Sequence, residues 1–262
     1  MQKCAVFFDI DGTIWDFESK IPASTVKAVK QLKENGHYAF LCSGRSRVNT
    51  RAKELTDMGF DGVIAGCGTY VEYQNQVIEQ SLLSWEEICR VMDIMKRENI
   101  AAMYEGADKL YVDNEAFGND SYIAFLWEEL GNECCDISAM TADSKVNKMC
   151  IDFKNSTRER VLECFAEDYD VVFHVFGPVG ELIPKGYSKA RGIERMCREL
   201  GIDRENTYAF GDSANDIQML QYVKFGVAMG NASQDAKEAA DYVTSNMKED
   251  GIWNGLKHFG LI

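Results

Sequence analysis

The chain contains 262 residues, of which 46% are hydrophobic and 27% charged, and its formal net charge is −14 at pH 7. Proteins that bind duplex nucleic acid usually present a basic surface, so this charge argues against nucleic acid as a partner. No apolar run approaches the ~20 residues needed to cross a bilayer, and an odd number of cysteines, nine, without a C-x-x-C pair indicates reduced thiols, so we expect a cytoplasmic protein without membrane contact.

Strands and helices alternate in the first third of the chain. We expect strands at 4–10, 37–44 and 61–68 and helices at 24–36 and 48–58. The run at 4–10 is almost wholly apolar, which is typical of a strand covered on both faces. Ser24 is the expected N-cap of the first helix and Gly36 its terminator.

The last third repeats this alternation. We expect helices at 188–201, 214–223 and 233–243 and strands at 206–212, 225–230 and 242–245. Ser188 is the expected N-cap of the first of these helices. Alternation of this kind implies a parallel sheet with right-handed crossovers and helices on both faces, so the predicted fold class is α/β, doubly wound and Rossmann-like.

The middle third has a different order, α-ββ-α-β-α-ββ. Ser84 and Glu87 form a capping-box pattern at the start of its first helix. A run at 170–184 predicts a hairpin that turns at Gly177-Pro178. The remaining predicted elements are strands at 101–105, 109–113 and 146–153 and helices at 121–130 and from 156. We therefore predict an α+β cap domain at 82–184, inserted into a core domain of 1–81 and 185–262.

Polar residues and glycines follow several of the predicted parallel strands. The groups are Asp9-Ile10-Asp11-Gly12-Thr13, Ser43-Gly44-Arg45, Gly66-Cys67-Gly68-Thr69 and Gly211-Asp212-Ser213-Ala214-Asn215-Asp216. Open α/β sheets bind ligands at the carboxyl ends of their strands. The sequence therefore places carboxylates, a hydroxyl and flexible backbone at one edge of the sheet, where they can form a site.

Several better-known motifs are not met. Calcium loops need Gly at position six and Glu at position twelve, but counting from Asp9 these places hold Ile14 and Lys20. Val71 stands where a dinucleotide-binding loop would have its third glycine, and no phosphate-binding P-loop is present. The three histidines are dispersed along the chain and form no evident catalytic or zinc pattern.

Four segments together resemble the motifs of the haloacid dehalogenase superfamily, and they occur in the family's order. They are DIDGT at 9–13, Ser43-Gly44-Arg45, Lys189 and GDSAND at 211–216. The tail at 226–252 and the insertion between the second and third motifs resemble the Cof-type sugar-phosphate phosphatases, which have a C2 (type IIB) cap. This resemblance covers the whole chain, although the cap matches by pattern rather than by residue.

The resemblance implies a Mg²⁺-dependent phosphatase. The ion would be held by the Asp9 carboxylate, the Asp11 backbone carbonyl and the Asp212 carboxylate, with Asp216 in support. Asp9 would be the nucleophile, and Asp11 would protonate the leaving oxygen and then activate water. For these roles we expect Mg²⁺ and Lys189 to keep Asp9 ionised, and Asp11 to have a raised pKa.

Other residues are expected to bind the phosphoryl group. The Ser43 hydroxyl and the Gly44 amide would contact its oxygens, and Asn215 would add a hydrogen bond. Lys189 is preferred over Lys185 as the catalytic lysine because G-Y-S-K matches the third motif and places Lys189 at a helix start.

The substrate would be a small phosphorylated metabolite, with sugar phosphates as the family's default, and no feature indicates an obligate protein partner. Candidate leaving-group contacts in the cap are Tyr104, Glu105, Tyr111, Lys148 and Glu181. The roles of Arg45 and Cys67 stay open, and Cys67 replaces an asparagine expected there. Two alternatives remain: a phosphotransferase such as a phosphomutase, and a non-catalytic sensor of phosphorylated ligands.

Overall fold

The chain divides into two compact units in the computed structural model, which describes residues 3–16, 18–174 and 177–262. The core unit consists of Met1–Arg45, Thr50–Glu79 and Tyr187–Ile262, and the inserted unit of Ser46–Asn49 and Gln80–Gly186. The short segment Ser46–Asn49 groups with the inserted unit, although it lies far upstream of the predicted insertion. Within the described residues, no helix combines the length and apolar composition that a bilayer-spanning segment needs.

A mainly parallel sheet forms the centre of the core unit, as the alternation of strands and helices predicts. Its strands in spatial order are β14 (Tyr242–Val243), β13 (Phe225–Ala228), β12 (Thr207–Gly211), β1 (Ala5–Phe8), β2 (Tyr38–Cys42), β3 (Gly62–Ala65), β4 (Tyr70–Tyr73) and β5 (Gln76–Gln80). The order runs outward from β1 in both directions, so the sheet is doubly wound, and β3 pairs with β4 antiparallel towards one edge.

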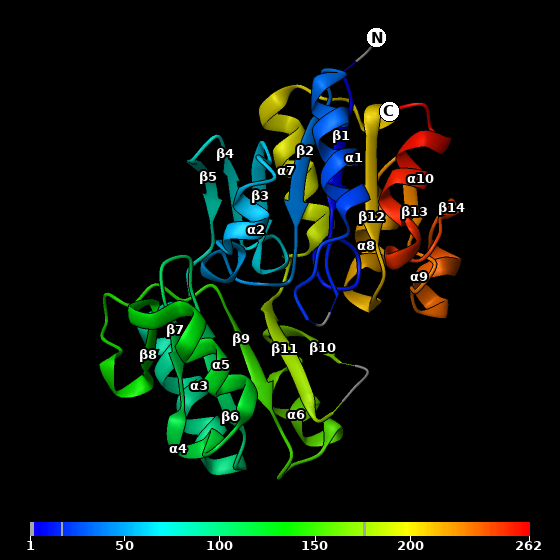
Figure 1. The fold of residues 1–262 in the computed structure, drawn as a ribbon. Helices are drawn as coiled ribbons and strands as arrows, with labels where there is room; N and C mark the ends of the chain where they lie inside the picture. The colour runs from blue at the N-terminus through cyan, green and yellow to red at the C-terminus, as the bar shows by residue number, and fades with distance from the viewer. Residues whose placement is uncertain (1–2, 17, 175–176) are drawn as a thin grey trace. The chain divides into compact units, whose positions relative to one another are not determined.

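Helices cover both faces of this sheet. They are α1 (Ala23–Glu34), α2 (Lys53–Thr56), α7 (Lys189–Leu200), α8 (Ile217–Tyr222), α9 (Gln234–Ala239) and α10 (Gly251–His258). In Figure 1, α1 and α10 lie in front of the sheet and α7 lies behind it, and α1 packs against α10 while α7 packs against α8. This arrangement explains why β1 reads as a continuous apolar run rather than an alternating one.

Aromatic side chains of the central strands stabilise the middle of the sheet. All four residues of β1 are fully buried. Phe7 stacks on Phe40 with a centroid distance of 5.1 Å, and Phe8 stacks on Phe210 at 5.2 Å. Each fully buried side chain of this kind contributes roughly 1.5–3 kcal/mol, and the position of β1 next to β12 is therefore firmly fixed.

Some local predictions for the core were wrong. Ser24 is not the N-cap of α1: the helix begins at Ala23, after Pro22 with φ −59°, because a proline readily occupies a helix start. The helix expected at 48–58 is limited to a 3-10 turn at Val48–Thr50 and the short α2. The strand expected at 61–68 ends at Ala65, since Cys67 adopts a left-handed conformation. The β4–β5 hairpin and α10 were not predicted.

The inserted unit is a mainly antiparallel sheet, with one parallel pair between β7 and β8, covered by helices. Its strands in spatial order are β10 (Tyr169–Phe173), β11 (Val179–Pro184), β9 (Lys148–Asp152), β6 (Ala101–Glu105), β7 (Leu110–Val112) and β8 (Cys134–Asp136). Its helices are α3 (Trp85–Glu98), α4 (Asn114–Phe117), α5 (Ser121–Leu130) and α6 (Arg158–Phe165). The predicted α+β order is present, with α4 and β8 as additions that were not predicted.

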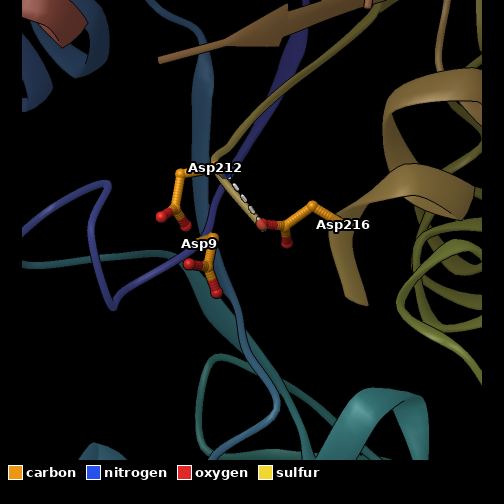
Figure 2. A group of neighbouring side chains, drawn as sticks. All are labelled: Asp9, Asp212 and Asp216. Atoms are coloured by element: carbon orange, nitrogen blue, oxygen red, sulfur yellow. Dashed lines mark hydrogen bonds between the residues drawn. The ribbon is translucent and has the colours of Figure 1, made fainter. Parts of the chain in front are cut away.

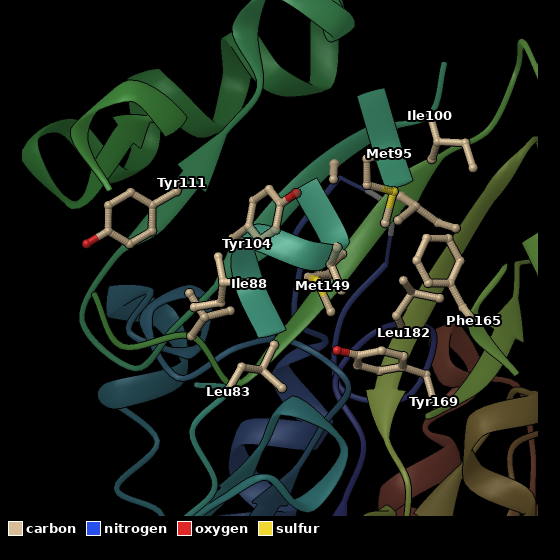
Figure 3. Close-up of a cluster of buried hydrophobic side chains, with 14 of the residues drawn as sticks. Leu83, Ile88, Met95, Ile100, Tyr104, Tyr111, Met149, Phe165, Tyr169 and Leu182 are labelled. Atoms are coloured by element: carbon tan, nitrogen blue, oxygen red, sulfur yellow. The ribbon is translucent and has the colours of Figure 1, made fainter. Parts of the chain in front are cut away.

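One face of this sheet packs a hydrophobic cluster against α3 and α6 (Figure 3). Its labelled members are Leu83, Ile88, Met95, Ile100, Tyr104, Tyr111, Met149, Phe165, Tyr169 and Leu182. Tyr104 and Tyr111 are only 2% and 6% exposed within it. Core packing therefore accounts for both tyrosines, which the sequence offered as leaving-group contacts.

The other three cap candidates form a buried ion cluster on neighbouring strands. Lys148 of β9 lies directly opposite Glu105 of β6, and its Nζ is 3.4 Å from Glu105 Oε1. The same Nζ donates to Oε2 of Glu181 in β11 at 2.9 Å. Their positions on adjacent strands bring them together, a proximity that the sequence spacing alone does not reveal.

Candidate active site

The carboxyl ends of β1 and β12 bring the first and fourth motifs side by side. The parallel register pairs Phe8 with Phe210, and the Asp9 amide donates to the Phe210 carbonyl at 2.9 Å. Asp9 therefore lies beside the loop that contains Asp212, although 203 residues of sequence separate them. The Asp9 side chain is buried in this position.

Lys189 lies at the centre of the group. The Ser188 hydroxyl accepts from the Arg191 amide at 3.2 Å and so caps α7, as predicted, which makes Lys189 the first helical residue. Its Nζ is 2.6 Å from Asp9 Oδ1, 2.5 Å from Asp216 Oδ1 and 3.1 Å from Asn215 Oδ1. Because Lys189 is 1% exposed, these contacts replace its hydration shell.

Asp216 fixes the shape of the fourth motif. Its Oδ2 accepts from the amides of Asp212 and Ser213 at 2.8 and 2.9 Å, while Oδ1 accepts from Lys189. A Cβ at Gly211 would come within 2.6 Å of the Asp216 Cγ, so only glycine allows this approach. Both Asp216 oxygens are thus engaged by protein donors, which favours a supporting role over direct metal ligation.

Three carboxylates can converge on a cation. Figure 2 shows Asp9, Asp212 and Asp216 grouped together, and each offers an oxygen within 4.8 Å of the others. Asp212 Oδ1 is buried and has no hydrogen-bond partner among the residues that the structure describes, an arrangement that native structures rarely leave uncompensated. Oxygen donors with an excess of negative charge suit a hard divalent ion, so Asp9 and Asp212 fit a metal site, with Asp216 in support.

Burial makes this concentration of charge unfavourable without a cation. Burial, followed by the Asp216 carboxylate, raises the pKa of Asp9 well above its ordinary value despite Lys189, and the same two causes raise the pKa of Asp212 to about 7. Burial would lower the pKa of Lys189, but Asp216 and Asp9 outweigh it and raise the pKa. Lys189 alone therefore does not offset burial and the neighbouring carboxylate at Asp9, and a cation would supply further positive charge; the expectation that Mg²⁺ and Lys189 together keep Asp9 ionised stays a prediction.

Asp11 is engaged by Arg45, whose role the sequence left open. Arg45 Nε donates to Oδ2 at 2.7 Å and Nη2 to Oδ1 at 2.8 Å, and Trp15 Nε1 donates to Oδ1 at 3.0 Å. Burial acts to raise the pKa of Asp11, but the hydrogen bonds and charge of Arg45 outweigh it and lower the pKa. The expected raised pKa of Asp11 is thus wrong, because a bidentate guanidinium stabilises the carboxylate.

The residues expected to bind phosphate lie at the same edge of the core sheet. Ser43 and Gly44 follow β2 directly and are both buried. The Ser43 Oγ accepts from the Arg45 amide at 3.1 Å, which leaves its own O–H to donate. Asn215 Oδ1 accepts from Lys189 and from the Ser213 hydroxyl, so its amide group is the donor that a ligand could use.

Two contacts of the site were not predicted, the Trp15 indole on Asp11 and the Asn231 carboxamide on Gly12. Asn231 follows β13, another parallel strand of the sheet. The rule that ligands gather at strand carboxyl ends would have nominated it, had it been applied to this strand as well. No local pattern identifies Trp15, since its contact depends on a tight turn at 10–15.

The fold and these loops define a hydrolase with an α/β core and an inserted α+β unit, and comparison with known proteins supports this class. A family model described as haloacid dehalogenase-like hydrolase matches residues 6–256. A Bacillus subtilis protein named "Putative phosphatase YkrA" is 33% identical over 262 residues, covering 100% of both chains. The chain therefore belongs to the haloacid dehalogenase-like hydrolase family, and it is an enzyme of the phosphoric monoester hydrolase class.

Solved structures agree with this assignment. A hypothetical protein of Geobacillus kaustophilus HTA426 superposes with a TM-score of 0.85 at 30% identity, covering 100% of both chains. The subclass IIB sugar phosphatase BT4131 of the same superfamily superposes with a TM-score of 0.82 at 29% identity, also covering 100% of both chains. The complete fold, inserted unit included, is therefore shared with these proteins.

Proposed function

We propose that the protein is a Mg²⁺-dependent phosphatase that hydrolyses small phosphate monoesters, sugar phosphates among them, through an aspartyl-phosphate on Asp9. One observation carries the proposal: Lys189 binds Asp9, Asp216 and Asn215 at once, at the edge of the sheet where the first and fourth motifs meet. The sugar phosphatase BT4131 shares the fold over the full chain and supports this substrate class.

A phosphate dianion and a carboxylate nucleophile repel one another, so the site needs local positive charge. The carboxylates of Asp9 and Asp212, with the Asp11 backbone carbonyl, would hold Mg²⁺, which would neutralise the phosphoryl oxygens when bound. Lys189 supplies the protein's own positive charge, fixed by hydrogen bonds before the substrate arrives. A charge fixed in advance needs little reorganisation during the reaction.

Asp9 attacks phosphorus and forms the covalent intermediate as the bond from phosphorus to the leaving oxygen breaks. Water then attacks phosphorus, gives its proton to Asp11 and releases free phosphate from Asp9. The Lys189 contact at 2.6 Å fixes the orientation of the Asp9 carboxylate and stabilises its charged form. The Ser43 hydroxyl, the Gly44 amide and the Asn215 amide group donate to the phosphoryl oxygens. Ser43 and Gly44 are buried, which makes their bonds stronger than they would be in water.

Asp11 protonates the leaving oxygen once Arg45 has released it. Arg45 makes two hydrogen bonds to Asp11, which lower the pKa of that carboxyl and favour its ionised form. A phosphate dianion offers the guanidinium another partner of suitable geometry. Transfer of Arg45 from Asp11 to the incoming anion would free Asp11 to take up a proton, so that the acid forms only in the presence of substrate.

A phosphate-release screen tests this function. The purified protein is incubated with Mg²⁺ and a panel of sugar, nucleotide and cofactor monoesters, with the Asp9→Asn variant as the matched control. Free phosphate released by the wild type and not by the variant is the expected result. Isomerised sugar phosphate without release would instead identify a mutase, and inactivity across the whole panel would favour a non-catalytic sensor.

A further inference from the structure

The loop Met229–Ser233, which follows β13, touches both acidic loops of the candidate site. The Met229 amide donates to the Gly211 carbonyl at 3.0 Å, and the Ser233 amide donates to the Asp212 carbonyl at 2.8 Å. These two bonds attach the loop to the backbone of the fourth motif. A side chain between them, Asn231, extends the attachment to the first motif.

The Asn231 carboxamide bridges two other segments of the core unit. Its Nδ2 donates to the Gly12 carbonyl at 2.8 Å, and its Oδ1 accepts from the Met247 amide at 2.9 Å. These bonds determine the orientation of the amide, because a flipped group would place its NH₂ against a backbone N–H and its oxygen against a carbonyl. Asn231 therefore directs a donor specifically at Gly12.

The Gly12 backbone also lies directly against the second acidic loop. With φ +78°, Gly12 adopts a conformation that favours glycine, and a Cβ there would lie 2.3 Å from Asp212 Oδ2. The Asp212 carboxylate thus packs directly on the Gly12 backbone. Asp9 lies three residues before Gly12 in the same loop. The position of the Gly12 peptide therefore sets the distance between the Asp9 and Asp212 carboxylates.

We propose that Asn231 is a positioning residue for the metal site, and the proposal rests on the function given above. By its side chain it fixes the Gly12 peptide, and by its loop it fixes the Gly211–Asp212 backbone, so one short loop sets the separation of the Asp9 and Asp212 carboxylates. Asn231 itself is exposed and need not touch metal or substrate. Groups that orient ligands in this way typically change metal affinity 10–100-fold when they are replaced.

Magnesium binding measured by isothermal titration calorimetry tests this role without reference to turnover. Asn231→Asp keeps the size of the side chain and the acceptor for Met247 but removes the donor to Gly12. We expect it to weaken Mg²⁺ binding about tenfold. Asn231→Ala removes both bonds without adding charge, and it should weaken Mg²⁺ binding as well. This second variant keeps the test possible if the aspartate variant proves unstable.

Asn254→Asp is the matched control. The Asn254 Nδ2 donates to Ser245 Oγ at 3.0 Å and to the Glu249 carbonyl at 3.2 Å. Asn254 is thus another exposed carboxamide that supports the loop around Met247, but its bonds do not extend to Gly12. Its Mg²⁺ affinity should equal that of the wild type. Thermal unfolding of all three variants shows whether a loss of Mg²⁺ affinity comes from general destabilisation of the protein instead.

The outcomes separate this inference from the proposed function. Equal Mg²⁺ affinity in wild type and both Asn231 variants, or an equal loss in Asn254→Asp, would overturn the positioning role while leaving phosphate release untouched. In a third outcome, the wild type releases no phosphate but binds Mg²⁺ more tightly than the Asn231→Asp variant does. That result would support the positioning role and contradict the phosphatase. A wild type that binds no Mg²⁺ would overturn both the metal dependence and the role of Asn231.

Discussion

Two buried lysines, one in each unit, lie among carboxylates, but their surroundings differ. Lys189 in the core unit contacts Asp9 and Asp216 from loops at strand ends. Lys148 in the inserted unit contacts Glu105 and Glu181 from within a sheet. Both lysines are almost completely buried. Similar residue types and similar burial therefore occur in two clusters, only one of which belongs to a family motif.

The difference lies in how the surrounding negative charge is balanced. In the inserted unit, burial raises the pKa of Glu105 despite Lys148, so the balance there is only partial. Burial also acts to raise the pKa of Glu181, but the charge of Lys148 outweighs it and lowers that pKa, and His174 Nε2 adds a contact at 3.3 Å. In the core unit, Asp212 has a pKa raised to about 7 and a buried oxygen that finds no hydrogen-bond partner within the described part of the chain. Incomplete charge compensation is typical of sites built for a ligand, whereas balanced clusters are more often structural.

The largest expected effect on kcat comes from replacing Asp9, the proposed nucleophile in the Lys189 cluster. Asp9→Asn should lower kcat roughly 10⁴-fold or more, because no carboxylate remains to form the covalent intermediate. The fold should survive, since the change removes one of three crowded negative charges. Phosphate release and thermal unfolding measure the two effects. Activity near that of the wild type would rule out the mechanism proposed above.

The two lysines themselves provide the next test. Lys189→Met and Lys148→Met should each destabilise the protein by about 3–5 kcal/mol, because each leaves buried carboxylates without their partner. Only Lys189→Met should also lower kcat of the folded protein, by about 10³-fold. Denaturant unfolding and phosphate release under native conditions separate these effects. An equal loss of kcat in Lys148→Met would mean that the comparison between a structural and a catalytic cluster is wrong.

The sequence predicted the elements whose signals are local. The caps at Ser84 and Ser188 and the strands at β1 and β12 follow from side chains and apolar runs that lie next to each other in the chain. The convergence of Asp9 and Asp212 was also predictable, because strand carboxyl ends meet at one edge of a parallel sheet.

Contacts that depend on strand order could not be predicted in this way. Glu105, Lys148 and Glu181 meet only because β6, β9 and β11 are neighbours, which spacing does not specify. The effect of Arg45 on Asp11 was missed for a related reason: the pKa expectation considered the metal and not the cation 34 residues away. Side chains that act across strands or loops need the tertiary structure.

The dependence of stability on pH should also distinguish the clusters. The pKa of Asp212 rises from the ordinary value of 3.8 to about 7 in the folded protein, so the folded state binds this proton more tightly than the unfolded chain. Without Mg²⁺, the free energy of unfolding should therefore fall as pH rises from about 4 to about 7, by at most ~1.4 kcal/mol per pH unit. Protons compete with a cation, so the rise in Tm caused by Mg²⁺ should grow over the same range.

Thermal unfolding of wild type and Asp212→Asn, with EDTA or with Mg²⁺, measures this dependence. The difference in stability between the two proteins isolates the contribution of Asp212 from that of the other carboxyl groups. It should change with pH in EDTA, and Mg²⁺ should raise the Tm of the wild type more than that of the variant. A pH-independent difference in EDTA would show that the Asp212 carboxyl is not perturbed in the folded protein.

The smallest expected effects come from two matched helix caps. Ser84 accepts from the Glu87 amide at the start of α3, and Ser188 accepts from the Arg191 amide at the start of α7, both at 3.2 Å. Replacement of either serine by alanine should cost about 1 kcal/mol and lower Tm by about 2–4 °C. Because Lys189 follows Ser188 directly, only Ser188→Ala should also reduce kcat several-fold, through looser placement of the lysine against Asp9. Phosphate release that fell equally in Ser84→Ala, or stayed unchanged in Ser188→Ala, would contradict this expectation. The start of α7 would then be a structural feature like the start of α3, and the bonds of Lys189 to Asp9 and Asp216 would be enough to position the lysine.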